Sequence, residues 1–292
     1  MTTRMRNKKF LSVIILLAVL AFALPAQPLV GYLGPQGTYS QEACQVFFGK
    51  DGNLVPFESV KSAVEALANG KSDYAVIPQE NTIGGAVIDY VDVLISHKEV
   101  FVTGEVELPI TQNLLTLPGT KLSDIKEVYS HKQGIIQGKE WMSKNIPDAK
   151  VIEVASTAAG AKLVAEKKNP AYAAISLAAC AGVYRLEIIA PSIQNSNSNK
   201  TRFYVLSLKE PAEDPAERLA FIVTGKAKEL PALMSEMKKK KMTLVTIHDR
   251  PKKTELGEYY YVIECIGSYK SYQKLTRKSN FDFRYLGSFD VR

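Results

Sequence analysis

The chain is poor in the residues that build disulfide scaffolds and metal centres. Its 292 residues include only three cysteines and three histidines, and no Cys-x-x-Cys or His-x-x-x-His pair brings them to metal-ligand spacing. The sequence also lacks a Gly-x-Ser-x-Gly nucleophile elbow and a Gly-x-x-x-x-Gly-Lys-Ser/Thr phosphate loop. These absences argue against a disulfide framework and a zinc site, and we expect no cofactor.

Acidic residues are in the minority, because 37 Lys and Arg exceed 30 Asp and Glu by seven. A basic excess can indicate a nucleic-acid partner. Here, however, four cations (Arg4, Arg6, Lys8 and Lys9) precede the first acidic residue, and removal of residues 1–23 leaves a net charge of 7 − 4 = +3. We therefore expect no nucleic-acid partner.

Those cations are followed by an apolar run, residues 10–24, that is shorter than the roughly 20 residues of a membrane-spanning helix. The run contains Ala21-Phe22-Ala23, the small-x-small pattern of a signal peptidase site, and Pro25 follows it. This order predicts a signal peptide, residues 1–23, cleaved after Ala23, and an exported, periplasmic protein. An uncleaved N-terminal anchor is the alternative, and it would leave the protein on the same side of the membrane.

Strand and helix patterns alternate through the rest of the chain. Strand-like apolar runs cover residues 29–34, 74–78, 99–102, 127–130 and 173–176, and helix-like stretches cover residues 59–69, 138–145 and 156–168. The alternation predicts an α/β fold with layered sheets and helices on both faces. The polar segment 209–217 holds two prolines and predicts a linker. Beyond it, residues 218–292 follow a βαββαβ order, which predicts a second, smaller domain.

Four polar segments lie where α/β proteins place their binding groups, at strand ends and helix starts. Residues 34–38 offer backbone N–H groups and a hydroxyl at a helix start, which suits an anion but also fits a plain turn. Residues 78–85 bring together a carboxylate, an amide and a hydroxyl. Ser156-Thr157 is a hydroxyl pair at a helix N-cap. Residues 199–203 supply an amide, a hydroxyl and a guanidinium suited to bidentate carboxylate binding.

In this order and spacing, the segments resemble the motifs of prephenate dehydratase, a family of the phenylalanine pathway. Residues 34–38 match its opening motif, residues 78–85 its Glu-Asn-Ser-x-x-Gly motif with Thr for Ser, and Ser130-His131-x-Gln133 its His motif. Ser156-Thr157-Ala158 and Asn199-x-Thr201-Arg202-Phe203 complete the set. The resemblance begins near Val30. It implies that residues 28–208 form a catalytic domain of two lobes, similar to a type II periplasmic binding protein, and that residues 218–292 resemble an ACT domain.

The resemblance implies conversion of prephenate to phenylpyruvate, with loss of carbon dioxide and the ring hydroxyl, and without a cofactor. Thr201 is the expected catalytic residue, assisting hydroxide departure by a positioned hydrogen bond in an interlobe cleft. Arg202 is expected to neutralise a substrate carboxylate. The other expected substrate-binding residues are Thr38, Glu80, Asn81, Thr82, Gly85, His131, Ser156, Thr157, Asn199 and Phe203.

Two of these roles are open. A carboxylate at Glu80 would repel a dianion unless it is protonated or hydrogen-bonded, so support of the loop at Asn81 is an alternative to a direct role. His131 could be a cleft residue or merely a hydrogen-bonding residue at a strand end.

Two other functions fit parts of the pattern. An exported two-lobed chain could be a binding protein for a small carboxylate or amino acid, without catalysis, and a degenerate amino-acid sensor is a third reading. A receptor has no special need of Thr201 beside Arg202, nor of the C-terminal domain. A degenerate sensor would have lost the cleft motifs. We therefore favour the enzyme.

The C-terminal domain departs from the family at its effector site. Where the family usually has Gly-Ala-Leu and Glu-Ser-Arg-Pro, this chain has Pro231-Ala-Leu233 and His248-Asp249-Arg250-Pro251. Proline removes a backbone N–H and adds a ring. We therefore expect phenylalanine to bind weakly or not at all through Leu233, His248, Asp249, Arg250 and Pro251, although drift in a site that still binds is the alternative. ACT-like domains often pair, so the resemblance also implies a homodimer or homotetramer.

Overall fold

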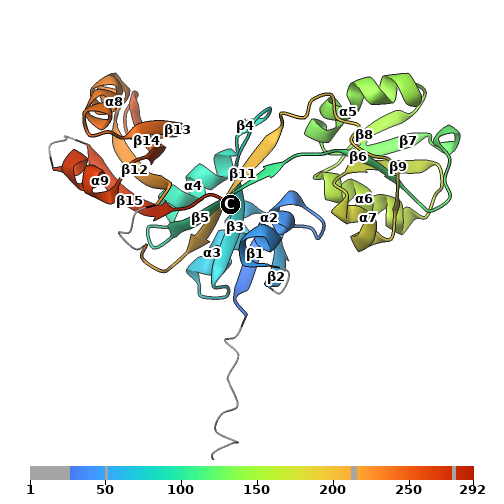
Figure 1. Ribbon diagram of the computed structural model, residues 1–292, viewed down its shortest axis with the longest axis horizontal. Coiled ribbons are helices and arrows are strands. Elements are labelled where there is room, and N and C mark those ends of the chain that lie inside the picture. Colours follow the sequence, from blue (N-terminus) through green and yellow to red (C-terminus); the bar gives the residue numbers. More distant parts are fainter. Residues whose placement is uncertain (1–26, 50–51, 212–215, 278–280) are drawn as a thin grey trace, which may run out of the picture.

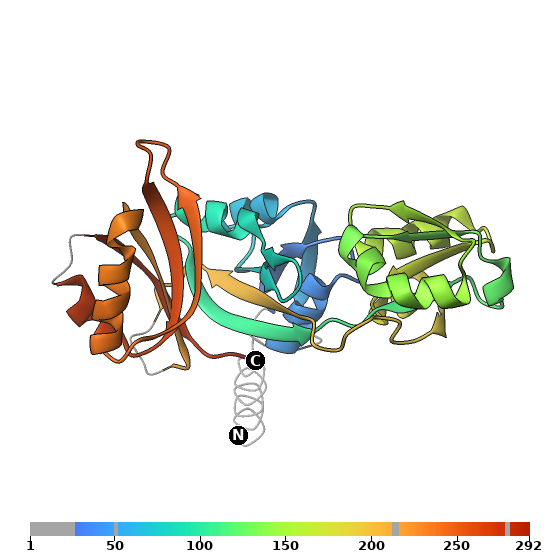
Figure 2. The same cartoon turned by 90° about the horizontal axis from the view of Figure 1, so that it is seen from above.

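The computed structural model of the chain describes residues 27–49, 52–211, 216–277 and 281–292. These residues form three bodies in a row. Lobe 1 (elements within residues 29–109 and 200–207) lies in the centre, lobe 2 (elements within residues 113–190) at one end and the C-terminal domain (elements within residues 218–289) at the other (Figures 1 and 2). The predicted signal peptide, residues 1–23, and residues 212–215 of the predicted linker lie outside the described residues. Within the described ranges, no helix combines the length and apolar character that crossing a membrane requires.

Lobe 1 is built on one mixed sheet. Its strands run in the order β2 (Asn53–Phe57), β1 (Leu29–Leu33), β3 (Tyr74–Asn81), β11 (Lys200–Ser207) and β5 (Phe101–Pro109), and the short β4 (Gly85–Ala86) pairs with β3. β1 is parallel to β2 and β3, whereas β11 is antiparallel to β3 and β5. The helices of lobe 1 are α2 (Tyr39–Phe48), α3 (Val60–Ala68) and α4 (Ile88–Ser96). Strand β11 lies between β3 and β5 and forms ladder hydrogen bonds with both.

Successive residues of β11 face opposite sides of this sheet, as the pleat of a strand requires. Phe203 packs in the core that α2 covers. Tyr204 packs in the core formed by α3, α4 and the C-terminal domain. By the same alternation, Thr201 and Arg202 point to opposite sides of the sheet.

Lobe 2 is inserted between β5 and β11, so the chain crosses from lobe 1 to lobe 2 and back. Its sheet has the order β10 (Glu187–Ala190), β6 (Asn113–Thr116), β9 (Tyr172–Ser176), β7 (Glu127–Ser130) and β8 (Lys150–Glu153). Its helices are α5 (Lys132–Asn145), α6 (Thr157–Lys167) and α7 (Ala179–Tyr184), with a 3-10 turn at Leu122–Asp124. This confirms the two-lobed α/β organisation predicted for the catalytic region.

The C-terminal domain has the βαββαβ order that the sequence predicts. Its elements are β12 (Arg218–Lys226), a 3-10 turn (Ala227–Glu229), α8 (Leu230–Lys239), β13 (Thr243–Pro251), β14 (Glu258–Ile266), α9 (Tyr269–Thr276) and β15 (Asp282–Phe289). The antiparallel sheet has the order β13-β14-β12-β15. Both helices pack on one of its faces.

The other face of that sheet packs directly on lobe 1. Ile222 of β12 and Val262 of β14 are buried in one core with Val64 of α3 and Tyr90 of α4. Full burial of such a side chain stabilises the fold by roughly 1.5–3 kcal/mol. The C-terminal domain therefore shares a core with lobe 1, and side chains of the two can meet without solvent between them.

Candidate active site

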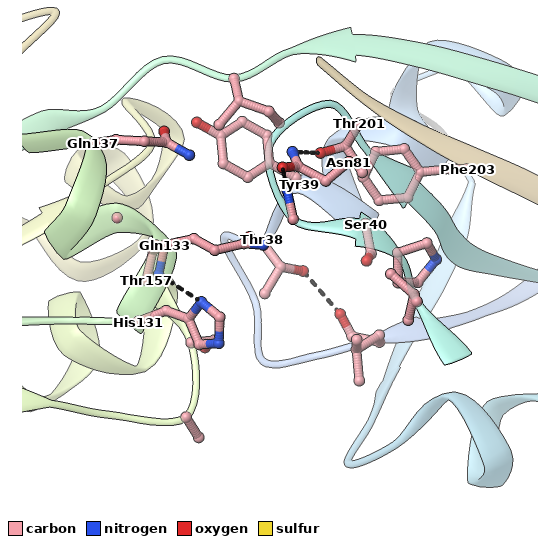
Figure 3. A pocket seen from close by; sticks show the side chains of 18 of the residues that line it. Thr38, Tyr39, Ser40, Asn81, His131, Gln133, Gln137, Thr157, Thr201 and Phe203 are labelled. Atoms are coloured by element: carbon pink, nitrogen blue, oxygen red, sulfur yellow. Dashed lines mark hydrogen bonds between the residues drawn. The ribbon is translucent and has the colours of Figure 1, made fainter. Parts of the chain in front are cut away.

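A cavity of about 370 Å³ lies between the two lobes. This volume is within the range of roughly 300–1,000 Å³ that small-molecule sites occupy. Figure 3 shows the side chains of the two lobes gathered around this cleft. The polar side chains that line it are Thr38, Tyr39, Ser40, Asn81, Gln112, His131, Gln133, Gln137, Ser156, Thr157 and Thr201. No Lys, Arg, Asp or Glu is among the described residues of the lining.

Three helices of the described chain begin at this cleft. Thr38, His131 and Ser156 are the N-caps of α2, α5 and α6, and all three line the cavity. The Ser156 hydroxyl accepts the backbone N–H of Ala159 at 3.0 Å, and Nδ1 of His131 accepts that of Gln133 at 3.3 Å. A helix N-terminus carries about half a positive charge and has backbone N–H groups without partners in the helix. The cleft therefore suits an anion although no Lys or Arg lines it.

Asn81 fixes the position of Thr201 at the wall of the cleft. Oδ1 of Asn81 accepts the backbone N–H groups of Ile83 and Gly84 at 3.0 and 2.9 Å. This orients the amide so that Nδ2 faces β11, where it donates to Oγ1 of Thr201 and Oδ1 of Asn199, both at 2.9 Å. The Thr201 hydroxyl thus accepts a hydrogen bond, and none of the described residues accepts its own proton. That proton is available to a molecule in the cleft.

Arg202 and Glu80 do not reach the cleft, which corrects the prediction that Arg202 binds a substrate carboxylate there. Because Thr201 faces the cleft, the next residue of β11 points to the other side of the sheet. Glu80 is opposite Arg202 in β3, and its carboxylate lies 3.6 Å from Nη1 of Arg202 and 3.5 Å from Nε2 of His248. The Glu80 side chain therefore faces Arg202 and His248 rather than the cleft.

Arg202 is the centre of a buried ionic cluster between lobe 1 and the C-terminal domain. Its Nε and Nη2 donate to the two carboxylate oxygens of Glu105 in β5 at 2.7 and 2.8 Å, and Nη2 also donates to Glu264 in β14. The side chains of Glu105 and Glu264 are both 0% exposed. Glu264 also accepts hydrogen bonds from Tyr204 at 2.6 Å and Gln79 at 3.2 Å. Arg202, Glu105 and Glu264 are called the ionic cluster below.

Burial and shared charge set the protonation of this cluster. Burial raises the pKa of Glu105 to about 7; the charge of Glu264 adds to the rise, and the hydrogen bonds from Arg202 oppose it. Burial disfavours the charged form of Arg202, but hydrogen bonds to Glu105 and the charge of Glu264 outweigh it, so the pKa of Arg202 lies above its ordinary value. Arg202 therefore stays charged, whereas Glu105 takes up a proton near neutral pH.

The other predicted site residues divide between the cleft and its surroundings. Phe203 and Gly85 line the cleft. Asn199 is 0% exposed and holds the Asn81 amide without lining the cavity. The Thr82 hydroxyl donates a hydrogen bond to the backbone carbonyl of Lys200 at 3.1 Å. Thr82 also lines a second cavity, of about 320 Å³, together with Glu80 and Arg202. His131 both faces the cleft and caps a helix, so each reading of this residue fits in part.

The predicted effector residues lie at the surface of the C-terminal domain, in its core, or against lobe 1. Leu233 is buried in the core under α8. His248 bonds the Tyr90 hydroxyl through Nδ1. Arg250 donates to both carboxylate oxygens of Asp92 in α4 at 2.6 and 3.0 Å. The two exposed residues of this set, on edge strand β13, are Asp249 and Pro251.

Direct contacts between the lobes shape the cleft. Gly37 of lobe 1 has φ +82°, and a Cβ at this position would lie 2.8 Å from Sγ of Cys180 in lobe 2. The Cys180 thiol donates to the Gly37 carbonyl at 3.1 Å, and the Tyr184 hydroxyl donates to the Gln36 carbonyl at 2.6 Å. Both the positive φ and the close approach of Cys180 therefore require glycine at position 37.

Sequence reasoning missed several polar residues of the cleft and the partners of Arg202. Gln133 belongs to a motif matched to the family and could have been named from it. Gln112 and Gln137 carry no such signal, although Nε2 of Gln112 donates to Oε1 of Gln137 at 3.2 Å and Oε1 of Gln112 is buried without a partner among the described residues. Glu105 and Glu264 each interrupt an apolar strand run, which is the signal that a buried charge leaves in a sequence.

The described residues include no group of three or more His, Cys, Asp or Glu that could hold a metal ion. Cys44, Cys180 and Cys265 are free and buried. Burial raises the pKa of Cys180 to about 11, so its thiol is a poor nucleophile at neutral pH.

Comparison with known proteins finds prephenate dehydratases. The sequence model of the prephenate dehydratase family matches residues 30–211. The prephenate dehydratase of Lactococcus lactis is 30% identical over 252 residues, which cover 84% of this chain and 89% of that protein. The prephenate dehydratase of Arthrobacter aurescens, solved in complex with L-Phe, is 28% identical with a TM-score of 0.81, and the match covers 90% of each chain.

A structure described as a novel type of quorum quenching acylase also has a TM-score of 0.81, over 90% of this chain and 98% of that one. At 19% sequence identity, this likeness shows the fold alone. The family match, by contrast, spans more than half of the chain and includes the segments that carry Thr38, Asn81 and Thr201. It favours an enzyme over the binding protein that the two lobes also allow. The chain belongs to the prephenate dehydratase family of enzymes.

Proposed function

We propose that the chain converts prephenate to phenylpyruvate in the interlobe cleft and that Thr201 assists the departure of the ring hydroxyl. The carboxylate on the ring leaves as carbon dioxide, its bonding electrons enter the ring, and the carbon–oxygen bond of the hydroxyl breaks as the ring becomes aromatic. Because aromatisation drives the reaction, the protein mainly has to fix the geometry and stabilise the charge that develops on the leaving oxygen.

The hydrogen bond from Asn81 to Thr201 is the observation that carries this proposal. Since Nδ2 of Asn81 donates to Oγ1 of Thr201 at 2.9 Å, the Thr201 proton is directed away from Asn81 and is free for the leaving oxygen. The O–H of Thr201 becomes a better donor while its oxygen accepts from Asn81, because hydrogen bonds in a chain polarise one another. A weak acid in water can thereby act as a positioned donor in the cleft.

The distribution of charge supports the binding of a dianion by helix N-termini. Prephenate carries two carboxylates, and the N-caps Thr38, His131 and Ser156 bring three positive helix ends to one cavity. Each such end stabilises an anion by roughly 0.3–1 kcal/mol, and by up to about 2 kcal/mol when partly buried. The hydroxyl of Thr157, in the first turn of α6, adds a neutral donor to the same wall.

The C-terminal domain is proposed to be an ACT-like domain in which phenylalanine binds weakly or not at all. Its βαββαβ order supports the first part. The second part is supported by Arg250 and His248, which are engaged with Asp92 and Tyr90 of the same chain. Assembly into a homodimer or homotetramer and export to the periplasm are further parts of the proposal.

The activity is tested by incubating the purified chain with prephenate and measuring phenylpyruvate and carbon dioxide. We expect one of each per prephenate consumed, without added metal or nucleotide. Thr157→Val removes one donor from the cleft wall and should raise the KM for prephenate several-fold, with less effect on kcat. Thr246→Val, on β13 outside the cleft, is the matched control. Absence of phenylpyruvate with a folded wild-type chain would contradict the proposal.

A further inference from the structure

One carboxylate of the C-terminal domain reaches across the domain boundary to the two central strands of the catalytic sheet. Glu264 of β14 accepts hydrogen bonds from Arg202 and Tyr204 of β11 and from Gln79 of β3. Its side chain is 0% exposed, and a buried carboxylate persists only where charge and hydrogen bonds compensate its desolvation. The partners of Glu264 on lobe 1 are therefore held firmly in place.

The strands that Glu264 holds on one face carry the proposed catalytic pair on the other. In the β3–β11 pairing, Thr201 is opposite Asn81, and Arg202 is opposite Glu80. The register shifts between Arg202 and Phe203, so that Gln79 lies at a β-bulge. A bulge interrupts the regular hydrogen bonds of the ladder, so side-chain contacts have a larger part in fixing the backbone there.

We propose that Glu264 is a positioning residue of the active site, which acts through Arg202 and Gln79 to hold β11 and β3 in the register that aligns Thr201 with Asn81. This inference rests on the proposed function of Thr201. In Glu264→Gln the charge that faces Arg202 and Arg218 is lost, and one of the two acceptor oxygens is replaced by an NH2 donor. Either Arg202 of β11 or the pair Gln79 and Tyr204 then faces a donor and loses its acceptor. The bulge is then free to relax, and the Thr201 hydroxyl moves away from the geometry that Asn81 imposes.

The decisive experiment combines Glu264→Gln with Thr201→Val in a double-mutant cycle on prephenate turnover. We expect Glu264→Gln to lower kcat roughly tenfold or more while the KM changes little, because a displacement of about 1 Å at a reacting group can reduce the rate by about a hundredfold. In the Thr201→Val background, Glu264→Gln should change kcat by less than about twofold, because the group it positions is gone.

Asp92→Asn is the matched control. It removes the charge and one of the two acceptor oxygens of another bidentate Arg pair at the same domain boundary, between Arg250 and α4, away from β3 and β11. It should lower stability without lowering kcat, and its effects should be additive with those of Thr201→Val. Glu264→Asp, which keeps the charge, should recover part of the lost kcat.

A second measurement does not depend on activity. Hydrogen–deuterium exchange of peptides that cover residues 77–83 and 199–204 should quicken in Glu264→Gln and not in Asp92→Asn. Equal exchange in Glu264→Gln and wild type, or a loss of kcat that is fully additive with Thr201→Val, would overturn the inference. An inactive wild-type chain with quickened exchange in Glu264→Gln would instead refute the proposed reaction and keep the positioning of β11.

Discussion

Glu105 should make the stability of the chain depend on pH in a direction opposite to that of a salt-bridged surface carboxylate. Its side chain is 0% exposed, and burial raises its pKa from 4.5 to about 7. Below about pH 4.5 the carboxyl is protonated in both the folded and the unfolded chain. Between pH 4.5 and 7 only the folded chain holds the proton, so the free energy of unfolding falls as pH rises through this window.

The size of this effect follows from the pKa. Each tenfold change in proton affinity corresponds to about 1.4 kcal/mol, so a pKa raised from 4.5 to about 7 corresponds to a contribution of about 3 kcal/mol in total. Most of this contribution is lost between about pH 5 and about pH 8. In Glu105→Gln no proton is exchanged at this position, so its free energy of unfolding should fall less than that of the wild type, by an amount on the order of 2 kcal/mol.

Urea unfolding of the two proteins at about pH 5 and about pH 8 measures this difference. Other groups titrate in the same window, and the comparison between wild type and variant removes their contribution. Glu107→Gln is the control, because Glu107 lies on the same strand with its side chain 33% exposed and pairs with Lys200. An equal pH dependence in wild type and Glu105→Gln would refute the reasoning about the ionic cluster.

Three further predictions concern Arg202, the effector site and the N-terminus. Arg202→Lys should lower the free energy of unfolding by less than the roughly 3–5 kcal/mol that removal of a buried charge partner costs, because lysine keeps the charge but loses the bidentate pair with buried Glu105. It should lower kcat more than it raises the KM, because the cleft is untouched. A change in KM alone, measured by steady-state kinetics, would restore the substrate-binding role. Titration of activity and of the thermal midpoint with phenylalanine should give little response, and a sub-millimolar inhibition constant, worth more than about 4 kcal/mol of binding, would overturn the weak effector site. N-terminal sequencing of protein made in a Gram-negative host should begin at Leu24, whereas an intact Met1 in a cytoplasmic fraction would contradict export.

Much of the fold was accessible from the sequence because its elements are strongly patterned. The strands of the C-terminal domain are apolar runs bounded by polar turns, and they follow the predicted βαββαβ order. The strand predicted at residues 74–78 is longer than expected and runs through Asn81. Pro78 lies beside the β-bulge of the β3–β11 pairing, a position at which strands tolerate proline.

The site was only partly predictable. Alternation along a strand was enough to separate Thr201 from Arg202, yet the motif alone placed both in the cleft. The motif predicts that the Arg202 guanidinium binds a substrate carboxylate, whereas in the structure it binds the carboxylates of buried Glu105 and Glu264. Glu105 and Glu264 are far apart in sequence from each other and from the cleft motifs, so only the packing of the C-terminal domain on lobe 1 brings them to Arg202. Local patterns contain no information about that docking.

The role of the Thr201 proton is tested most directly by comparing Thr201→Ser with Thr201→Val at saturating prephenate. Serine keeps an O–H that Asn81 can orient, whereas valine keeps the shape and lacks the donor. We predict that the kcat of the serine variant stays within about tenfold of the wild-type value and that the kcat of the valine variant falls by roughly 10²-fold or more, with a similar KM. A valine variant that forms phenylpyruvate at the wild-type rate would contradict the account.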